Sequence, residues 1–222
     1  MGTIYRMAEQ APTTIAVRGS AELEVAPDYA LISVTALVRA DDKGEAVEDA
    51  NEIVGVARQA VEAAEVRSVR FGRLAQHRER YQNKETGAAE DGMWVVAISG
   101  SVEVDVEDVS YVAGVLSAAD LLINGITWLL ETDNPAHRLV RKAAVDDAFV
   151  AAADFADAIS AKIGRLATLA DPGLSSSGAG AGGLLGAIPR GAIGGFDSSE
   201  EIDLDPSDVV VRAWVEAVFE IA

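Results

Sequence analysis

Cysteine is absent from this chain of 222 residues, and histidine occurs only twice, at His77 and His137. The missing thiols exclude disulfide bonds, thiolate metal sites and cysteine nucleophiles. A zinc site would have to combine carboxylates with two imidazoles that lie in a predicted strand and at the start of a predicted helix. We therefore expect neither a bound metal nor a cofactor.

Basic residues are scarce, with 18 lysines and arginines against 36 acidic residues and a formal net charge of −18. This charge would repel nucleic acid and an anionic membrane surface. No apolar run approaches the roughly 18 residues that a membrane-spanning helix needs. We expect a soluble protein that has no nucleic-acid partner and no membrane span.

A secretory signal is not recognisable in the first eleven residues, because no apolar core precedes a small-residue cleavage site. The expected compartment is the cytoplasm, or an extracytoplasmic one if the chain is a processed form.

Reactive motifs are missing as well. No serine lies in a Gly-x-Ser-x-Gly elbow, and the acidic residues between 200 and 208 do not have the spacing of a calcium-binding EF-hand loop. Paired carboxylates could still support hydrolysis, since many acidic residues offer many chance pairs. We expect no enzymatic activity, and a hydrolase using acidic residues is the least favoured alternative.

Alternating apolar and polar residues predict several strands. Residues 13–25 and 29–39 alternate on either side of an Ala-Pro-Asp turn, which favours a hairpin. In residues 93–106, Ser99 and Ser101 alternate with apolar residues and are expected to face solvent or a sister chain. Further strands are predicted at 66–82, 121–131, 165–170 and 209–221.

Helical periodicity indicates two long helices and a short one, at 109–118. In the first long helix Asp41 and Asp42 offer N-caps, and the apolar stripe consists of Val47, Ala50, Val54, Ala57, Val61 and Ala64. The second is predicted to begin at Asn134-Pro135 and to end at Gly164. Its expected buried stripe consists of Val145, Phe149, Ala152, Ala156, Ile159 and Ile163.

These elements predict an α+β fold, in which an antiparallel-rich sheet is backed by amphipathic helices. We expect a tail at 1–12 and one domain at 13–222. The order strand, helix, strand, strand occurs twice, which suggests two βαββ-like halves at 13–106 and 107–222.

A glycine-rich loop is predicted at 173–200. A dinucleotide-type glycine spacing occurs in it, but no amphipathic helix follows, so we do not adopt that interpretation. The loop is more apolar than a linker requires, and its apolar residues either cover their own domain or contact a neighbouring subunit. These expected subunit-contact residues are Leu184, Leu185, Ile188, Ile193 and Phe196.

Four segments resemble one protein family. Residues 19–30, Gly-Ser-Ala-Glu-Leu-Glu-Val-Ala-Pro-Asp-Tyr-Ala, resemble the start of SIMPL-domain proteins, a domain of unknown function. Ile123-Asn124-Gly125-Ile126 resembles the "INGI" strand of that family. The Ala-rich helix with Arg141 and Asp147 resembles its helix motif, and residues 209–221 resemble its last strand.

The resemblance implies an α+β fold in a bacterial SIMPL-like protein and supplies no catalytic residues. Members of the family are often secreted or periplasmic, and ring-like or channel-like oligomers and a link to oxidative-stress protection have been described for some. The leading hypothesis is therefore a non-enzymatic homo-oligomer with a stress-related role. The alternative is a small-molecule or peptide-binding module with a groove between sheet and helices.

Overall fold

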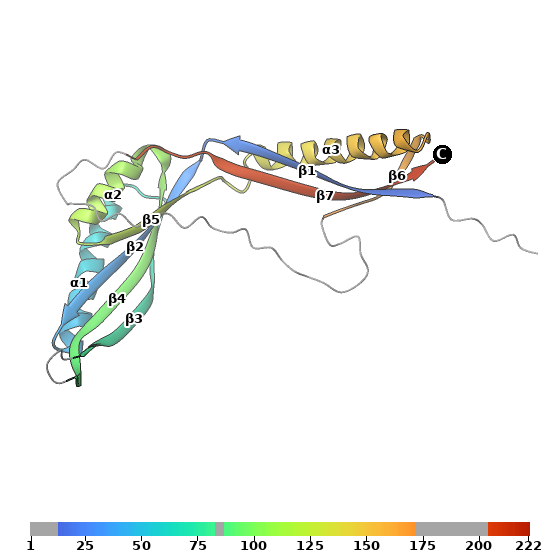
Figure 1. Ribbon diagram of the computed structural model, residues 1–222. Coiled ribbons are helices and arrows are strands. Elements are labelled where there is room, and N and C mark those ends of the chain that lie inside the picture. The colour runs from blue at the N-terminus through green and yellow to red at the C-terminus, as the bar shows by residue number, and fades with distance from the viewer. Residues whose placement is uncertain (1–12, 83–86, 172–203) are drawn as a thin grey trace, which may run out of the picture. The chain divides into compact units, whose positions relative to one another are not determined.

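The computed structural model describes residues 13–82, 87–171 and 204–222, which form three α-helices and two antiparallel sheets (Figure 1). The expected α+β fold is confirmed. The chain divides into two compact units that are interleaved in sequence. Of the described residues, unit 1 contains 13–25, 132–171 and 210–222, and unit 2 contains the others. The expected boundary at residue 106 does not coincide with this division.

The sheet of unit 2 has the strand order β3-β4-β2-β5. Its members are β2 (Tyr29–Ala40), β3 (Ser68–Gln82), β4 (Ala89–Asp105) and β5 (Leu122–Leu129). Because β4 and β5 occupy both edges of β2, no edge is free for β1 (Thr14–Val25). The expected hairpin between residues 13–25 and 29–39 is therefore wrong, and β1 belongs to the other sheet.

Helices α1 (Lys43–Glu62) and α2 (Val109–Ala118) cover one face of this sheet, and a short 3₁₀ turn, Val106–Asp108, precedes α2. The Asp42 carboxylate caps α1 as expected, accepting from the N–H groups of Gly44 and Glu45 at 2.7 and 3.1 Å. The core contains Ile32 and Val102 of the sheet and Val61 of α1. Side chains alternate along a strand, so every second residue of these strands lies on the face away from the helices. Most side chains on that face are partly or fully exposed.

The sheet of unit 1 has the order β1-β7-β6, with β7 (Val209–Ile221) in the centre and β6 (Ile163–Ala170) at an edge. The N–H of Ile221 donates to the carbonyl of Thr13 at 3.0 Å, so the start of β1 lies beside the end of β7. Helix α3 (Ala136–Ala158) packs mainly on β1 and only slightly on β6. Because α3 packs unevenly on the sheet, apolar side chains of β6 remain exposed.

Helix α3 begins as predicted and ends earlier than predicted. The Asn134 side chain accepts from the N–H of Ala136 at 2.9 Å. The helix stops at Ala158 because Ser160 has a left-handed φ of 57° and the N–H of Ala161 returns to the carbonyl of Ala156 at 2.9 Å. The end predicted at Gly164 is wrong, since that residue lies in β6.

The buried stripe of α3 also differs from the prediction, which is correct only for Ala152 and Ala156. Phe149 and Ile159 are exposed, and Ile163 lies in β6. The side chains that are buried follow a spacing of four residues: Ala136, Val140, Ala144, Ala148, Ala152 and Ala156.

Close approach of α3 to β1 explains this stripe. A Cβ on Gly19 would lie 2.0 Å from the Ala144 carbonyl oxygen and 2.8 Å from the Ala148 Cβ. The N–H of Ser20 donates to the Asp147 carboxylate at 2.9 Å. The contact therefore selects small side chains, and hydrophobicity alone did not predict it.

Candidate functional site

Helix α3 buries small side chains and exposes large apolar ones. Five of its six buried residues are alanines, whereas Leu139 is 57% exposed and Phe155 is 60% exposed. An ordinary amphipathic helix has the opposite arrangement, because burying a large apolar side chain is worth roughly 1.5–3 kcal/mol. The exposed residues of α3 therefore form an apolar surface that the described part of the chain does not bury.

Unit 1 as a whole shares this property. Among the described residues sixteen large hydrophobic side chains are exposed, and ten of them belong to unit 1. Concentrations of this kind mark interaction sites more often than scattered single residues do. The ten are Leu23, Leu139, Phe149, Val150, Phe155, Ile159, Leu166, Leu169, Val210 and Trp214.

One group of these residues lies on the helix side of the sheet, where α3 leaves β6 uncovered. The Phe149 ring meets the Phe219 ring edge-on at a centroid distance of 4.8 Å. Leu166 is the cross-strand partner of Phe219, and Leu169 is the partner of Ala217. Phe149, Leu166 and Leu169 therefore form an exposed group, which we call the helix-side patch.

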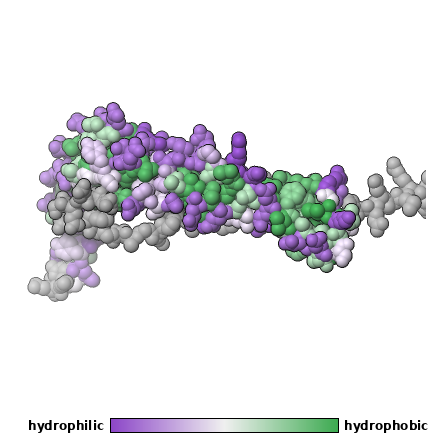
Figure 2. Space-filling view, turned by 90° about the horizontal axis from the view of Figure 1, so that it is seen from above, coloured by the Kyte–Doolittle hydropathy of each residue, from purple (hydrophilic) through white to green (hydrophobic). Residues whose placement is uncertain are grey.

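The other flank of α3 carries an open apolar hollow of about 200 Å³, lined by Ile15, Ala16, Phe155 and Ile159. Hydrophobic side chains gather over the part of the molecule that contains α3 (Figure 2). We call Phe155 and Ile159 the end patch. The four residues that line the hollow all have apolar side chains. The hollow is too open to enclose a drug-sized ligand, so it fits a side chain of another protein better.

The face of the sheet opposite α3 carries a second type of surface. Two cross-strand ion pairs lie on it, Arg18 with Glu216 at 3.0 Å and Arg212 with Glu22 at 2.6 Å. Trp214 is two residues from both Arg212 and Glu216 on β7, so it lies on the same face, and it is 48% exposed. We call Trp214 and Val210 the outer patch.

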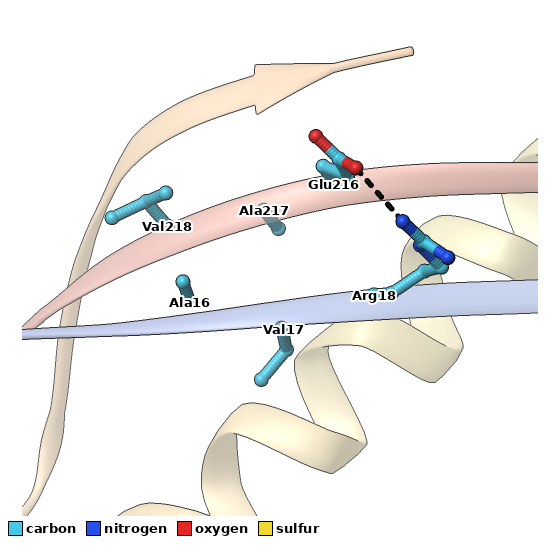
Figure 3. Close-up of a pocket in the computed structure, with 6 residues that line it drawn as sticks. All are labelled: Ala16, Val17, Arg18, Glu216, Ala217 and Val218. Carbon is cyan, nitrogen blue, oxygen red and sulfur yellow. Dashed lines mark hydrogen bonds and ion pairs between the residues drawn. The ribbon is translucent and has the colours of Figure 1, made fainter. Parts of the chain in front are cut away.

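Figure 3 shows how the two faces are separated near the first of these ion pairs. Val17 points toward α3, while Arg18 and Glu216 lie on the other side and are joined by the dashed line. A shallow hollow of about 300 Å³ is lined here by Ala16, Val17, Arg18, Glu216, Ala217 and Val218. On this face of β7 the exposed apolar residues Val210 and Trp214 therefore alternate with the ion-paired residues Arg212 and Glu216.

A third ion pair joins β6 to β7. The Arg165 guanidinium donates to both oxygens of Glu220 at 2.7 and 2.6 Å. These hydrogen bonds lower the pKa of the Glu220 carboxyl and raise that of Arg165, and desolvation opposes both shifts. The Arg165 side chain of this pair is 77% exposed, so the pair contributes only a small amount of stability.

The subunit-contact residues predicted from the sequence, Leu184, Leu185, Ile188, Ile193 and Phe196, lie outside the described residues. His77 and His137 fall in β3 and α3. Within the described ranges, no three His, Asp or Glu side chains are grouped closely enough to hold a metal ion. Nor is any polar or charged residue of these ranges buried. No helix in this part of the chain is long and apolar enough to cross a membrane.

Sequence reasoning missed the exposed apolar residues of α3, although a signal was present. Alanine or valine occurs at every fourth position from 136 to 156, and this small-residue stripe competes with the larger apolar residues for the buried face. Trp214 could have been assigned from alternation, because it falls on the same strand face as Arg212 and Glu216.

The fold and these surfaces define an α+β protein with two antiparallel sheets, whose described residues expose large apolar side chains mainly in unit 1. Comparison with protein families matches residues 15–219 to the SIMPL family, a protein family of unknown function (DUF541). The match spans nearly the whole chain, so the chain belongs to the SIMPL family. No curated protein matches it.

Proposed function

We propose that this protein is a non-enzymatic, self-assembling member of the SIMPL family and that unit 1 supplies the subunit contacts. The observation that carries the proposal is the burial pattern of α3. This helix buries alanines and exposes Leu139, Phe155 and other large apolar residues. Leaving such residues in water forgoes stabilisation that a second copy of the chain can supply.

A second copy is the occupant that these surfaces fit best. Two residues of the helix-side patch, Leu166 and Leu169, lie on β6, an edge strand, and edge strands offer free backbone groups for pairing between identical chains. The protein is strongly acidic, yet the lining of the end-patch hollow carries no charge of its own. Contact between apolar patches therefore brings no like charges into direct contact, although the net charge of the two chains still repels.

The presence of different patches on different faces favours a ring. The end patch and the outer patch are not the same surface, so contact between them is heterologous, and heterologous contacts close into rings when the rotation allows. We propose that the particle is a ring or channel built from such heterologous contacts. A role in oxidative stress rests on the family resemblance alone.

Phe155→Glu tests the proposal, because a carboxylate in the end patch would be desolvated in any subunit contact. We expect the variant to form a smaller particle than the parent protein does, when the particle mass is measured by light scattering after gel filtration. Tyr111→Glu is the matched control, since Tyr111 is an aromatic residue of α2 in unit 2 and is 62% exposed. It is expected to keep the parent mass.

Equal masses for the parent chain and both variants would contradict the proposed contact surface. Far-UV circular dichroism identifies a variant that has failed to fold, and in that case Ile159→Glu replaces Phe155→Glu at the same patch.

A further inference from the structure

A row of polar side chains crosses the face of the unit 2 sheet opposite α1 and α2. The register places Arg73 beside Ser99 and Ser99 beside Thr35. In the next row, Arg70 lies beside Ser101 and Ser101 beside Ser33. Cross-strand partners share a face, so two arginines and four hydroxyl groups lie together on this surface.

A β-bulge in β3 brings the two arginines to the same face. Residues 70 and 73 are three positions apart and would point to opposite faces of a regular strand. The register shifts between Phe71 and Arg73, which leaves Gly72 as the extra residue. The bulge thus makes Arg70 and Arg73 neighbours on one face.

A second bulge, in β5, lies on the same polar rows. The register shifts between Ser33 and Val34, so Asn124 is the extra residue there. Its amide donates to the Thr35 hydroxyl at 2.8 Å, and that hydroxyl is 3.1 Å from the Ser99 hydroxyl. Asn124, which belongs to the Ile-Asn-Gly-Ile segment, thereby orients a hydrogen-bonded chain that runs toward Arg73. Bulges are over-represented beside functional sites, where they re-aim side chains.

Arg70 and Arg73 differ from the other described cations of unit 2, because neither has an ion pair or cation–π contact with a described residue. Arg39 pairs with Glu79, Arg67 with Asp105 and Glu131, and Arg78 and Arg80 with Asp91. Lys43 and Arg58 lie over the rings of Trp94 and Phe71. In a chain with a net charge of −18, two arginines on neighbouring rows of one face, with no ion pair to a described acidic residue, offer a local site for an anion.

We propose that this surface, formed by Arg70, Arg73, Ser99, Ser101 and Thr35, binds one phosphate-type oxyanion, either free or as a phosphate monoester. Guanidinium groups present paired N–H donors that match the oxygens of such a group, and hydroxyl groups add further donors. Glu103, which follows on the same face of β4, limits the site to a single anionic group and disfavours a polyanion. The inference is independent of the proposed assembly.

Phosphorus-31 NMR tests the proposal, because the ligand signal broadens on binding whatever the size of the protein. The probes are inorganic phosphate and phenyl phosphate, each titrated at constant ionic strength. We expect broadening with the parent chain and at least about tenfold weaker binding with Arg70→Gln/Arg73→Gln, because two charge-assisted contacts are lost. Stronger binding of phenyl phosphate would identify a monoester as the ligand, and equal or weaker binding would identify free phosphate.

Arg78→Gln/Arg80→Gln is the matched control, since it removes the same charge from the same strand. It is expected to bind like the parent chain. The proposal is overturned if neither probe broadens with the parent chain, or if the control loses as much binding as the Arg70 and Arg73 variant. All four arginines are exposed, so circular dichroism should be the same for each protein.

Discussion

At the scale of single residues, Gly19 determines how closely α3 can approach β1. No side chain fits there, because its Cβ would lie 2.0 Å from one backbone oxygen of α3 and 2.6 Å from the Ala148 nitrogen. The same contact includes the hydrogen bond from Ser20 N–H to Asp147. Two of the residues on which the family resemblance was based, Gly19 and Asp147, therefore have a structural role in holding α3 on the sheet.

Gly19→Ala is expected to destabilise unit 1 by about 1–3 kcal/mol, because overpacking forces the helix away from the strand. Urea unfolding followed by circular dichroism measures the change. Gly55→Ala is the matched control: Gly55 lies in α1 with open space around it, and alanine favours a helix. The control should be as stable as the parent chain or up to about 1 kcal/mol more stable. Equal effects of both substitutions would show that Gly19 is not a close contact.

At the scale of elements, most strands and helices could be predicted from periodicity, because alternation and 3.6-residue repeats follow directly from backbone geometry. Residues 109–118 and 209–221 were predicted with the bounds that α2 and β7 have. The pairing of β1 was not predictable, since its partner β7 lies almost two hundred residues away and the local turn favoured β2. Periodicity carries no information about partners that distant.

The arrangement of polar residues on β3 was also beyond the sequence pattern. Arg70 and Arg73 have an odd spacing and would be assigned to opposite faces of a regular strand, and only the bulge at Gly72 brings them together. By contrast, the alternation of Ser99 and Ser101 was sufficient to place both serines on the face opposite the core residues Val102 and Val104. The expected subunit contacts at 184–196 remain a prediction.

The edge strand β6 is tied to β7 by Arg165 and Glu220, and this pair gives the molecule an acid-sensitive contact. Hydrogen bonds from Arg165 hold the folded-state pKa of Glu220 below its ordinary value of 4.5. Because the folded-state pKa is lowered, ionised Glu220 stabilises the fold above pH 4.5. This stabilisation is lost as the pH falls through the folded-state pKa.

Glu220→Gln should therefore reduce the steepness with which Tm falls on acidification below pH 4.5, because glutamine does not titrate. Thermal unfolding at a series of pH values measures this. Arg165→Gln removes the partner, and the double variant should add little to either single one, since all three break the same contact. Additive effects would show that the two residues act separately.

At the scale of the whole molecule, the proposed assembly requires two different patches on each chain. Phe155→Glu disables the end patch and Trp214→Glu disables the outer patch. If contacts are heterologous, each variant alone is a monomer, and a mixture of the two forms a dimer through the remaining intact pair of patches. Sedimentation velocity distinguishes these species. A single variant that dimerises by itself would show that identical patches meet.

The net charge of −18 acts against assembly through long-range repulsion, which dissolved salt screens. Salt strengthens apolar contacts or hardly affects them. Self-association is therefore expected to persist or strengthen at high ionic strength. Dissociation by salt would instead indicate contacts made mainly by ion pairs.

The most direct measurement is the mass of the unmodified chain in solution, obtained by sedimentation velocity over a range of protein concentrations. If the exposed apolar residues of α3 contact other copies of the chain, the measured species has several times the chain mass of 23.2 kDa. A single species of 23.2 kDa at every concentration would contradict self-assembly.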